Sequence, residues 1–252
     1  MEALTRKSLQ GVTNIIRFNW HYYVVALVAI ALLVVTKNLL SAYVAYILIT
    51  LTSATIIISL SVSYYIYDYS NIYKLSWLDE LQLSANNNLI NIHAGFDETS
   101  MAIQNKYPLC RLSVFDFYDP ARHTEISIER ARKAYPAYAG TIRVSTGKLP
   151  ALAPPANAVF LIFAAHEIRN TTERVRFFQQ LKNNVADNGV IVVTEHLRNT
   201  PNLLAYNIGA FHFLPESEWL LTFKKAGLTI EKKIFINPFV VTYFLKKDGN
   251  TP

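Results

Sequence analysis

The sequence has one cysteine, Cys110, and comparatively few charged residues. A single cysteine excludes an internal disulfide and any zinc site built from cysteines, and it is typical of a small buried side chain in a reducing compartment. Charged residues make up 17% of the chain, a low share for a soluble protein, whereas hydrophobic residues make up 52%. No segment repeats with the period of a solenoid or a propeller, which excludes those folds.

Clustered positive charge is also absent. The formal charge is +6, but the lysines and arginines are scattered along the chain. A nucleic-acid-binding surface requires basic residues gathered on one face, so no nucleic-acid partner is expected. No metal-ligand motif stands out either, and no metal site is expected.

Two runs near the N-terminus carry no formal charge, residues 20–36 and 39–67. The first is at the short end of what spans a bilayer, and the second is long enough to span with tilt. Only Lys37 and Asn38 separate them, which predicts a transmembrane helical hairpin over residues 1–68. A cleaved signal peptide or a buried helix pair would be the alternatives. No small-residue cleavage site is present, and the adjacent second run disfavours both.

The residues that flank the hairpin indicate its orientation. Aromatic residues gather before the first run and after the second, so a hairpin brings both groups to one membrane interface. Arg6, Lys7 and Arg17 precede the first run, while the turn holds only Lys37. This asymmetry places both ends in the cytoplasm, and a bacterial inner membrane is the expected location. A homo-oligomer is compatible with the sequence.

Residues 69–84 mix aromatic, apolar and acidic residues and predict a linker helix along the membrane, followed by a domain over 85–252. Within the domain, apolar runs without alternation predict strands covered on both faces, hence a mostly parallel sheet. Seven strands are expected: 89–93, 112–116, 141–145, 158–165, 190–195, 228–236 and 239–246. Helices are expected at 100–106, from Pro120 to about 135, from Asn170 to about 187, and from Pro215 to Gly227.

Three segments carry a family resemblance: Phe163–Asn170, Leu181–Val193 and Trp219–Leu228. Their order and spacing resemble class I S-adenosylmethionine-dependent methyltransferases, and most of all the ubiquinone and menaquinone methyltransferases. The resemblance covers roughly residues 85–246. It implies an α/β, doubly wound, Rossmann-like sheet of seven strands, mostly parallel, with an antiparallel C-terminal hairpin. It also implies S-adenosylmethionine at the carboxyl ends of strands one, two and four.

The first motif of that family, an acid followed by three alternating glycines, falls here on Asn91, His93, Gly95 and Asp97. Only Gly95 matches, and Ala94 lies beside it. Asn91 could hydrogen-bond the cofactor's amino group, and Asp97 or Glu98 could supply a carboxylate in its place. The alternative is a polar turn that has lost its ligand.

Asp116 ends the second predicted strand, where two carboxylate oxygens suit the two hydroxyls of a ribose. Phe117 is expected to cover the adenine, and Ala165 to border the methionine end of the cofactor. The alternative for Asp116 is a residue that only ends its strand.

Methyl transfer to a phenol or enol needs a base with a pKa near neutrality, and histidine is the natural one. His166 is the first candidate and His196 the second, with Glu195 beside them; Glu167 and His212 are further candidates. Each histidine could instead be a hydrogen-bonded loop residue. Arg169 could hold a carbonyl or carboxylate of the substrate, or pair with a neighbouring glutamate.

Residues 201–214 form an unusually apolar insertion. They predict either core packing or a lid over an acceptor pocket open to the bilayer, with Tyr206, Phe211 and His212 contacting the substrate. Hairpin and lid together favour a membrane-anchored methyltransferase acting on a quinone precursor, a long-chain phenol or a lipid. The alternatives are a degenerate methyltransferase fold serving as a membrane-tethered scaffold, and a dehydrogenase, which the lack of a glycine-rich fingerprint disfavours.

Overall fold

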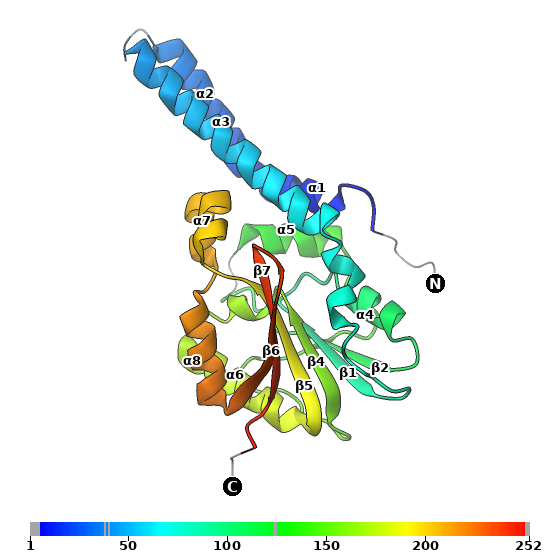
Figure 1. Cartoon of the computed structure of the whole chain (residues 1–252). Helices are drawn as coiled ribbons and strands as arrows, with labels where there is room; N and C mark the ends of the chain where they lie inside the picture. Colours follow the sequence, from blue (N-terminus) through cyan, green and yellow to red (C-terminus); the bar gives the residue numbers. More distant parts are fainter. Residues whose placement is uncertain (1–5, 38, 40, 123–124, 250–252) are drawn as a thin grey trace.

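The structure is a computed structural model that describes residues 6–37, 39, 41–122 and 125–249. Two long helices project from an α/β domain (Figure 1). They are α2 (Trp20–Thr36) and α3 (Ala42–Tyr64), which lie side by side as the predicted helical hairpin. A helix that was not predicted, α1 (Gln10–Phe18), precedes them and makes an angle of 70° with α2. Asn38, expected in the turn, lies outside the described residues.

The hairpin is apolar and exposed. The helical stretch Ala42–Lys74 is long and apolar enough to cross a membrane, with a mean hydropathy of 2.0, and only 6% of its most apolar window is buried. The bent pair α1 and α2 would be a second crossing segment only if the two helices count as one span. The helical hairpin is thus confirmed as a structure, whereas its insertion in a bilayer stays a prediction.

The linker helix expected over residues 69–84 is absent. A π-helical turn (Tyr65–Tyr69) ends α3, and two short 3₁₀ turns (Ile72–Lys74 and Ser76–Leu78) follow. Asn71 and Leu75 adopt left-handed backbone angles, which no continuous α-helix tolerates. The apolar residues between them are buried against the domain and the end of the hairpin, so packing overrides the helical pattern here.

The seven predicted strands form one sheet in the order β3-β2-β1-β4-β5-β7-β6. All neighbours are parallel except β7, which runs antiparallel to both β5 and β6, as the family resemblance implied. The doubly wound fold is therefore confirmed. The strands are β1 (Asn88–His93), β2 (Arg111–Asp116), β3 (Ile142–Arg143), β4 (Ala156–Ile162), β5 (Val185–His196), β6 (Leu228–Asn237) and β7 (Val240–Lys247).

Three strands differ from the prediction by more than one residue at an end. β3 has only two residues, because it pairs with β2 alone at the edge of the sheet. β4 ends at Ile162, since Phe163 adopts a positive φ of 53° and turns the chain. β5 starts at Val185, where its first residue pairs with Ala156 before a register shift.

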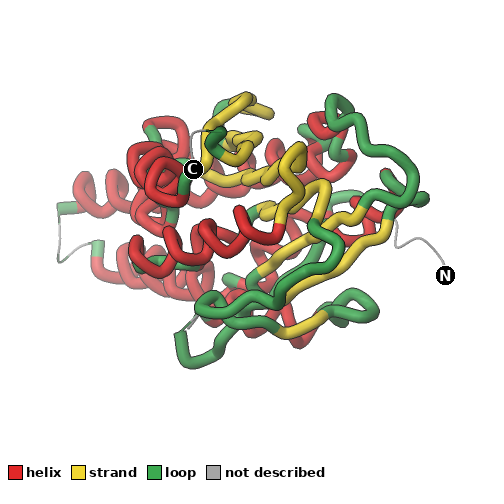
Figure 2. The backbone as a smooth tube through the Cα atoms, turned by 90° about the horizontal axis from the view of Figure 1, so that it is seen from below, coloured by secondary structure: helices red, strands yellow, loops and turns green. Residues whose placement is uncertain are grey.

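Helices cover both faces of the sheet (Figure 2). The helices of the domain are α4 (Ser100–Lys106), α5 (Ile126–Ala134), α6 (Thr171–Asn184), α7 (Thr200–Tyr206) and α8 (Glu216–Ala226), of which α7 lies at the hairpin end of the domain rather than on a face of the sheet. The predicted ends of two helices are confirmed: the Asn170 side chain accepts the Glu173 N–H at the start of α6, and Gly227 ends α8 with a φ of 70°. α5 begins later than Pro120 because the Asp119 carboxylate accepts the N–H of Ala121 and closes a separate turn.

Candidate active site

A cavity of about 240 Å³ lies where the strand order reverses, between β1 and β4. At that point the loops leaving two adjacent parallel strands diverge and open a crevice. The cavity is also lined by α5 and by α1. Its lining includes Gly11, Asn14, Ile15, Phe18, Tyr67, Tyr73, Ala94, Phe96, Glu98, Thr99, Glu125, Ile128, Ala131, Ile162, Phe163, His166, Glu167 and His212.

The roof of the cavity is α1. Both oxygens of the Asp68 carboxylate accept backbone N–H groups at the start of α1, from Gly11 and Val12, each at 2.8 Å. A carboxylate at this position satisfies unpaired N–H groups and the positive end of the helix dipole. Glycine is needed at position 11, because a Cβ there would lie 2.4 Å from that of Tyr67. Further along α1, Phe18 packs edge-on against Phe96, with ring centroids 5.8 Å apart.

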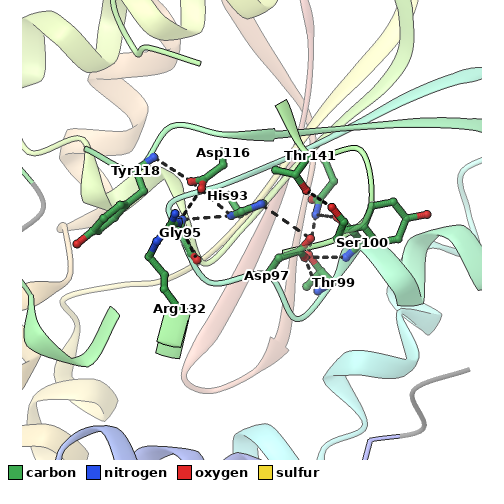
Figure 3. A network of polar contacts seen from close by, with 11 residues as sticks. His93, Gly95, Asp97, Thr99, Ser100, Asp116, Tyr118, Arg132 and Thr141 are labelled. Atoms are coloured by element: carbon green, nitrogen blue, oxygen red, sulfur yellow. Dashed lines mark hydrogen bonds and ion pairs between the residues drawn. The ribbon is translucent and has the colours of Figure 1, made fainter. Parts of the chain in front are cut away.

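The loop after β1 is held by its own polar side chains (Figure 3). Gly95 has a φ of 99°, and its N–H donates to Nδ1 of His93 at 3.1 Å. Asp97 caps α4: its Oδ1 accepts the N–H groups of Thr99 at 3.0 Å and Ser100 at 2.9 Å. The two side chains that replace glycines are therefore structural parts of the loop.

Arg132 of α5 closes the end of β2 (Figure 3). Its Nη1 donates to Oδ2 of Asp116 at 2.6 Å and to the carbonyl of Gly95 at 3.1 Å. The other carboxylate oxygen of Asp116 accepts the N–H of Tyr118 at 2.9 Å. Asp116 is buried, while the side chain of Arg132 is 25% exposed. Asp116, which was predicted to bind a ribose, is thus paired with Arg132, whose partly exposed side chain can move towards solvent.

Several buried polar atoms around this loop have no hydrogen-bond partner: Nε2 of His93, Oδ2 of Asp97 and Oδ1 of Asn91. Burial lowers the pKa of His93, so that its ring is neutral and Nδ1 accepts from Gly95. The amide nitrogen of Asn91 donates to the hydroxyls of Thr99 and Ser100. Nε2 of His93 and Oδ2 of Asp97 lie 3.9 Å apart (Figure 3), so the loop compensates part of its own polarity, and a polar ligand would supply the hydrogen bonds that these atoms and Oδ1 of Asn91 lack.

On the other side of the cavity, His166 forms a buried pair with Glu195. Nδ1 of His166 lies 2.6 Å from Oε2 of Glu195, and the His166 backbone N–H donates to Oε1 at 3.2 Å. The other ring nitrogen, Nε2, lies 3.2 Å from Oε1 of Glu167. Burial alone would lower the pKa of His166, but the two carboxylates outweigh it and raise the pKa to about 10.

His212 joins this cluster from the 3₁₀ segment Asn207–His212. Its Nε2 lies 3.3 Å from Oε1 of Glu167, and its Nδ1 lies 2.5 Å from Oε1 of Glu125. Arg169 also contacts the His212 ring and donates to its backbone carbonyl. Burial alone would raise the pKa of Glu167, but hydrogen bonds from His166 and His212 hold that pKa well below its usual range. The predicted residues His166, Glu195, Arg169 and His212 thus meet at one place.

His196, the second candidate base, is not among the residues that line the cavity. Its ring is stacked between Phe163 and Phe213, with centroids 4.9 and 4.8 Å away. Nδ1–H donates to the carbonyl of Phe239 at 3.1 Å, so Nε2 accepts the hydroxyl of Tyr67 at 2.8 Å. Burial, with a smaller contribution from His166, lowers the pKa of His196 to about 3. The residue links the hairpin to the domain, and the base role does not fit this position.

The remaining predicted site residues divide into two groups. Ala94 lines the cavity as expected. Phe117 packs against Phe177 in the core rather than at the cavity, and Ala165 is likewise a core residue. Tyr206 lies 3.5 Å from the hydroxyl of Ser63 on α3, and the ring of Phe211 is 62% exposed beneath Arg198. The lid residues therefore contact the hairpin or solvent. Sequence reasoning missed Arg132, Glu125 and Tyr67, whose roles depend on contacts distant in the chain.

Comparisons with known proteins agree with this geometry. The family model of an O-methyltransferase domain matches residues 50–204, more than half of the chain. No curated protein matches the sequence. Similar solved structures include an S-adenosylmethionine-dependent methyltransferase from Clostridium acetobutylicum ATCC 824, with 10% identity, 71% of this chain and 90% of that chain covered, and a TM-score of 0.50.

Two further structures have the same fold. One is a SAM-dependent methyltransferase from Aquifex aeolicus, with 12% identity, 71% and 93% coverage and a TM-score of 0.51. The other is an O-methyltransferase family 2 protein from Planctomyces limnophilus DSM 3776 in complex with apigenin, with 15% identity, 77% and 61% coverage and a TM-score of 0.50. At such identities the likeness is one of fold.

Proposed function

The chain belongs to the O-methyltransferase domain family, and from that premise we propose that it methylates an oxygen of a lipophilic small molecule at a membrane surface. The enzyme is a methyltransferase, and S-adenosylmethionine is its methyl donor. Quinone precursors and long-chain phenols are the acceptor classes that we propose. The observation that carries the proposal is the His166–Glu195 pair, which is buried and opens into a cavity at the switch point of the sheet.

The first side of the cavity suits the methyl donor. Ala94, Phe96 and Thr99 of the Gly95 loop line the cavity. Asp116 lies behind the lining, with two carboxylate oxygens that could accept ribose hydroxyls and that Tyr118 and Arg132 now occupy. Glu98 lines this side of the cavity as well, where its carboxylate pairs with Arg6 at 2.7 Å, and a positively charged ligand would compete with that guanidinium. When bound, S-adenosylmethionine supplies a methyl group on a sulfonium, which is already a good leaving group. Arg132 would have to leave Asp116 for this part of the site to open.

The second side suits the acceptor. We assign His166 to take the acceptor's hydroxyl proton, with Glu195 holding Nδ1 and Nε2 directed towards Glu167 and His212. Because the two carboxylates raise its pKa to about 10, only the deprotonated ring can act as the base, and turnover should therefore rise with pH towards 10. Ile15, Phe18 and Phe96 add an apolar wall that excludes water from the reacting atoms. The protein's contribution is therefore alignment, exclusion of water and proton removal.

A lipophilic acceptor is supported by the surface around the hairpin. On α7 and the segment after it, Leu204, Ile208 and Phe211 are 71%, 86% and 62% exposed. α7 lies beside the domain end of α3, so this patch continues the apolar surface of the hairpin (Figure 1). Continuous exposed apolar surface of this kind indicates contact with a membrane. We propose that the hairpin anchors the enzyme in a bacterial inner membrane with the domain in the cytoplasm.

Binding and turnover can be tested separately. Titration of the full chain in detergent with S-adenosylmethionine and its demethylated product should show binding, and no binding at millimolar ligand would leave a degenerate scaffold as the better interpretation. His166→Ala should abolish turnover of a long-chain phenol and keep cofactor affinity. His21→Ala is the matched control, since His21 contacts Arg130 away from the cavity lining. Full activity of His166→Ala would refute the assigned role.

The membrane assignment has its own test. The full chain should stay with membranes after extraction with alkaline carbonate, because a transmembrane hairpin resists conditions that release surface-bound proteins. Release into the supernatant would refute the anchor and leave methyl transfer itself untouched.

A further inference from the structure

We propose that His166, Glu167 and His212 bind a divalent transition-metal ion, and that this ion binds the acceptor's oxygen. The acceptor part rests on the proposed function, whereas metal binding stands on the geometry alone. The three side chains come from two separate loops, the 3₁₀ turn Ala165–Glu167 after β4 and the segment Asn207–His212. One ligand atom from each lies within 4.8 Å of the others.

The spacing of the three atoms is that of a metal coordination shell. Nε2 of His166 and Nε2 of His212 lie 3.2 and 3.3 Å from the same oxygen, Oε1 of Glu167. Charge-assisted hydrogen bonds of this kind are usually shorter, about 2.7–2.9 Å. Two ligand atoms about 2.0–2.1 Å from a zinc ion, at the tetrahedral angle, are about 3.3–3.4 Å apart. The two separations from Glu167 match that edge, and the two Nε2 atoms lie within 4.8 Å of each other, so the three ligand atoms surround a space in which an ion can bind once the histidines adjust.

Both histidines have the outer partners that metal-binding histidines require. Nδ1 of His166 is held by Glu195 at 2.6 Å, and Nδ1 of His212 by Glu125 at 2.5 Å. A carboxylate on the far nitrogen fixes the tautomer in which Nε2 is a lone-pair donor, orients the ring and raises its basicity. Two histidines and one glutamate, each histidine backed by a carboxylate, form the ligand set of a catalytic zinc site with an open position.

The charges of the cluster favour the binding of a divalent cation. The cluster holds three carboxylates, those of Glu125, Glu167 and Glu195, and one guanidinium, that of Arg169, which lies 3.9 Å from Glu125. Two more positive charges make the cluster neutral, and either two imidazolium protons or one divalent ion can supply them. Glu167 and Glu195 are buried, so uncompensated negative charge at these two residues would be costly.

Arg169 is the group that a metal ion would displace. Its Nη2 contacts both ring nitrogens of His212, including the proposed ligand atom. The side chain is 43% exposed and lies 3.9 Å from Glu125, so it can leave the ring and keep that carboxylate as its partner. Removing this guanidinium should therefore strengthen metal binding.

The open coordination position faces the cavity, since all three ligands line it. A phenol or enol bound there would release its hydroxyl proton to solvent as it enters, before the apolar wall closes off water, and the ion would then hold the anionic oxygen for methyl transfer. A divalent ion lowers the pKa of a bound oxygen acid strongly. In the metal-bound enzyme His166 is a ligand, and its role as proton acceptor belongs to the metal-free form.

Cobalt(II) is the probe, because four-coordinate Co²⁺ has strong visible absorption bands and replaces zinc. The full chain in detergent, stripped with a chelator and dialysed, should bind one equivalent of Co²⁺ with those bands, and Zn²⁺ should displace it. His212→Ala should weaken Co²⁺ binding at least tenfold, Arg169→Ala should strengthen it, and the control His21→Ala should leave it unchanged. No absorption at millimolar Co²⁺, or an unchanged spectrum in His212→Ala, would overturn the proposal.

A parallel titration with S-adenosylmethionine distinguishes this proposal from the proposed function. Co²⁺ binding without cofactor binding would retain the metal site and refute methyl transfer. Cofactor binding without Co²⁺ binding would refute the metal site and keep methyl transfer with His166 as the base.

Discussion

Arg132→Ala should make the enzyme bind S-adenosylmethionine more tightly. Arg132 donates to Asp116 at 2.6 Å and to the Gly95 carbonyl at 3.1 Å, where the ribose of the cofactor is expected. The ligand and the guanidinium therefore compete for the same acceptors. Removing the guanidinium leaves the Asp116 carboxylate ready to accept hydroxyl groups.

The expected gain follows from the bonds that the cofactor must break. A hydrogen bond to a charged group contributes about 1.5–3 kcal/mol. The side chain of Arg132 is 25% exposed, so water can replace part of the hydrogen bonding that the guanidinium loses when it leaves Asp116. The lower end of that energy range therefore applies. About 1.4 kcal/mol corresponds to a tenfold change in the dissociation constant. We expect binding of S-adenosylmethionine to tighten roughly tenfold.

Isothermal titration calorimetry of the full chain in detergent measures this effect. Arg122→Ala is the matched control, because Arg122 pairs with Glu173 and touches neither Asp116 nor Gly95. Asp116→Ala should weaken binding by about 1–3 kcal/mol, and in that background Arg132→Ala should bring no further gain. If Arg132→Ala leaves the affinity unchanged or lowers it, Arg132 does not compete with the cofactor and the reasoning is refuted.

Three further predictions concern stability. His196 has a pKa of about 3 in the folded chain against about 6.5 in the unfolded chain, so the free energy of unfolding should fall by about 1.4 kcal/mol per pH unit between about pH 6 and pH 4. Urea unfolding of His196→Gln should lack that component, and equal slopes in both proteins would contradict it. Asp68→Ala should destabilise α1 by about 1–2 kcal/mol, seen as faster hydrogen exchange at Gly11 and Val12; unchanged protection would argue against the cap. Gly95→Ala should lower the free energy of unfolding in urea by about 1–3 kcal/mol, because an added Cβ would lie 2.9 Å from the Tyr118 ring. Gly140→Ala should lower it less, since Gly140 shares the positive φ but has no atom within 4 Å of an added Cβ. Equal losses in the two variants would show that the Tyr118 contact is unimportant.

The sheet could be predicted because its signals are local. Buried strand segments such as 158–162 and 190–193 are continuous apolar runs. The helix ends at Asn170 and Gly227 depend on the side chain or the backbone freedom of one residue. The start of α5 could not be predicted in this way. Pro120 suits a first helical turn, but whether the helix continues depends on the competing turn that Asp119 closes.

The site was predictable only in part, because several of its contacts join residues that are distant in the sequence. His166 and Glu195 leave adjacent parallel strands at the same edge, so topology alone brings them together. Arg132 lies in the helix that was predicted, but its contact with Asp116 joins a helix to the end of a strand and no local pattern in the sequence marks it. The pattern around His196 matches that of a catalytic loop, and only Tyr67, Phe163 and Phe213, distant in the sequence, make it a structural residue.

The capping of α1 by Asp68 has a consequence for the order of events during synthesis. α1 is translated before the hairpin, but its N–H groups gain their partner only once Asp68, which follows the hairpin, has been translated as well. Its other contacts, with Phe96 and with Tyr135, are translated later still. A hairpin delivered to the membrane early would therefore wait there with its first helix undocked. The roof of the cavity is completed last, once the domain beneath it has folded.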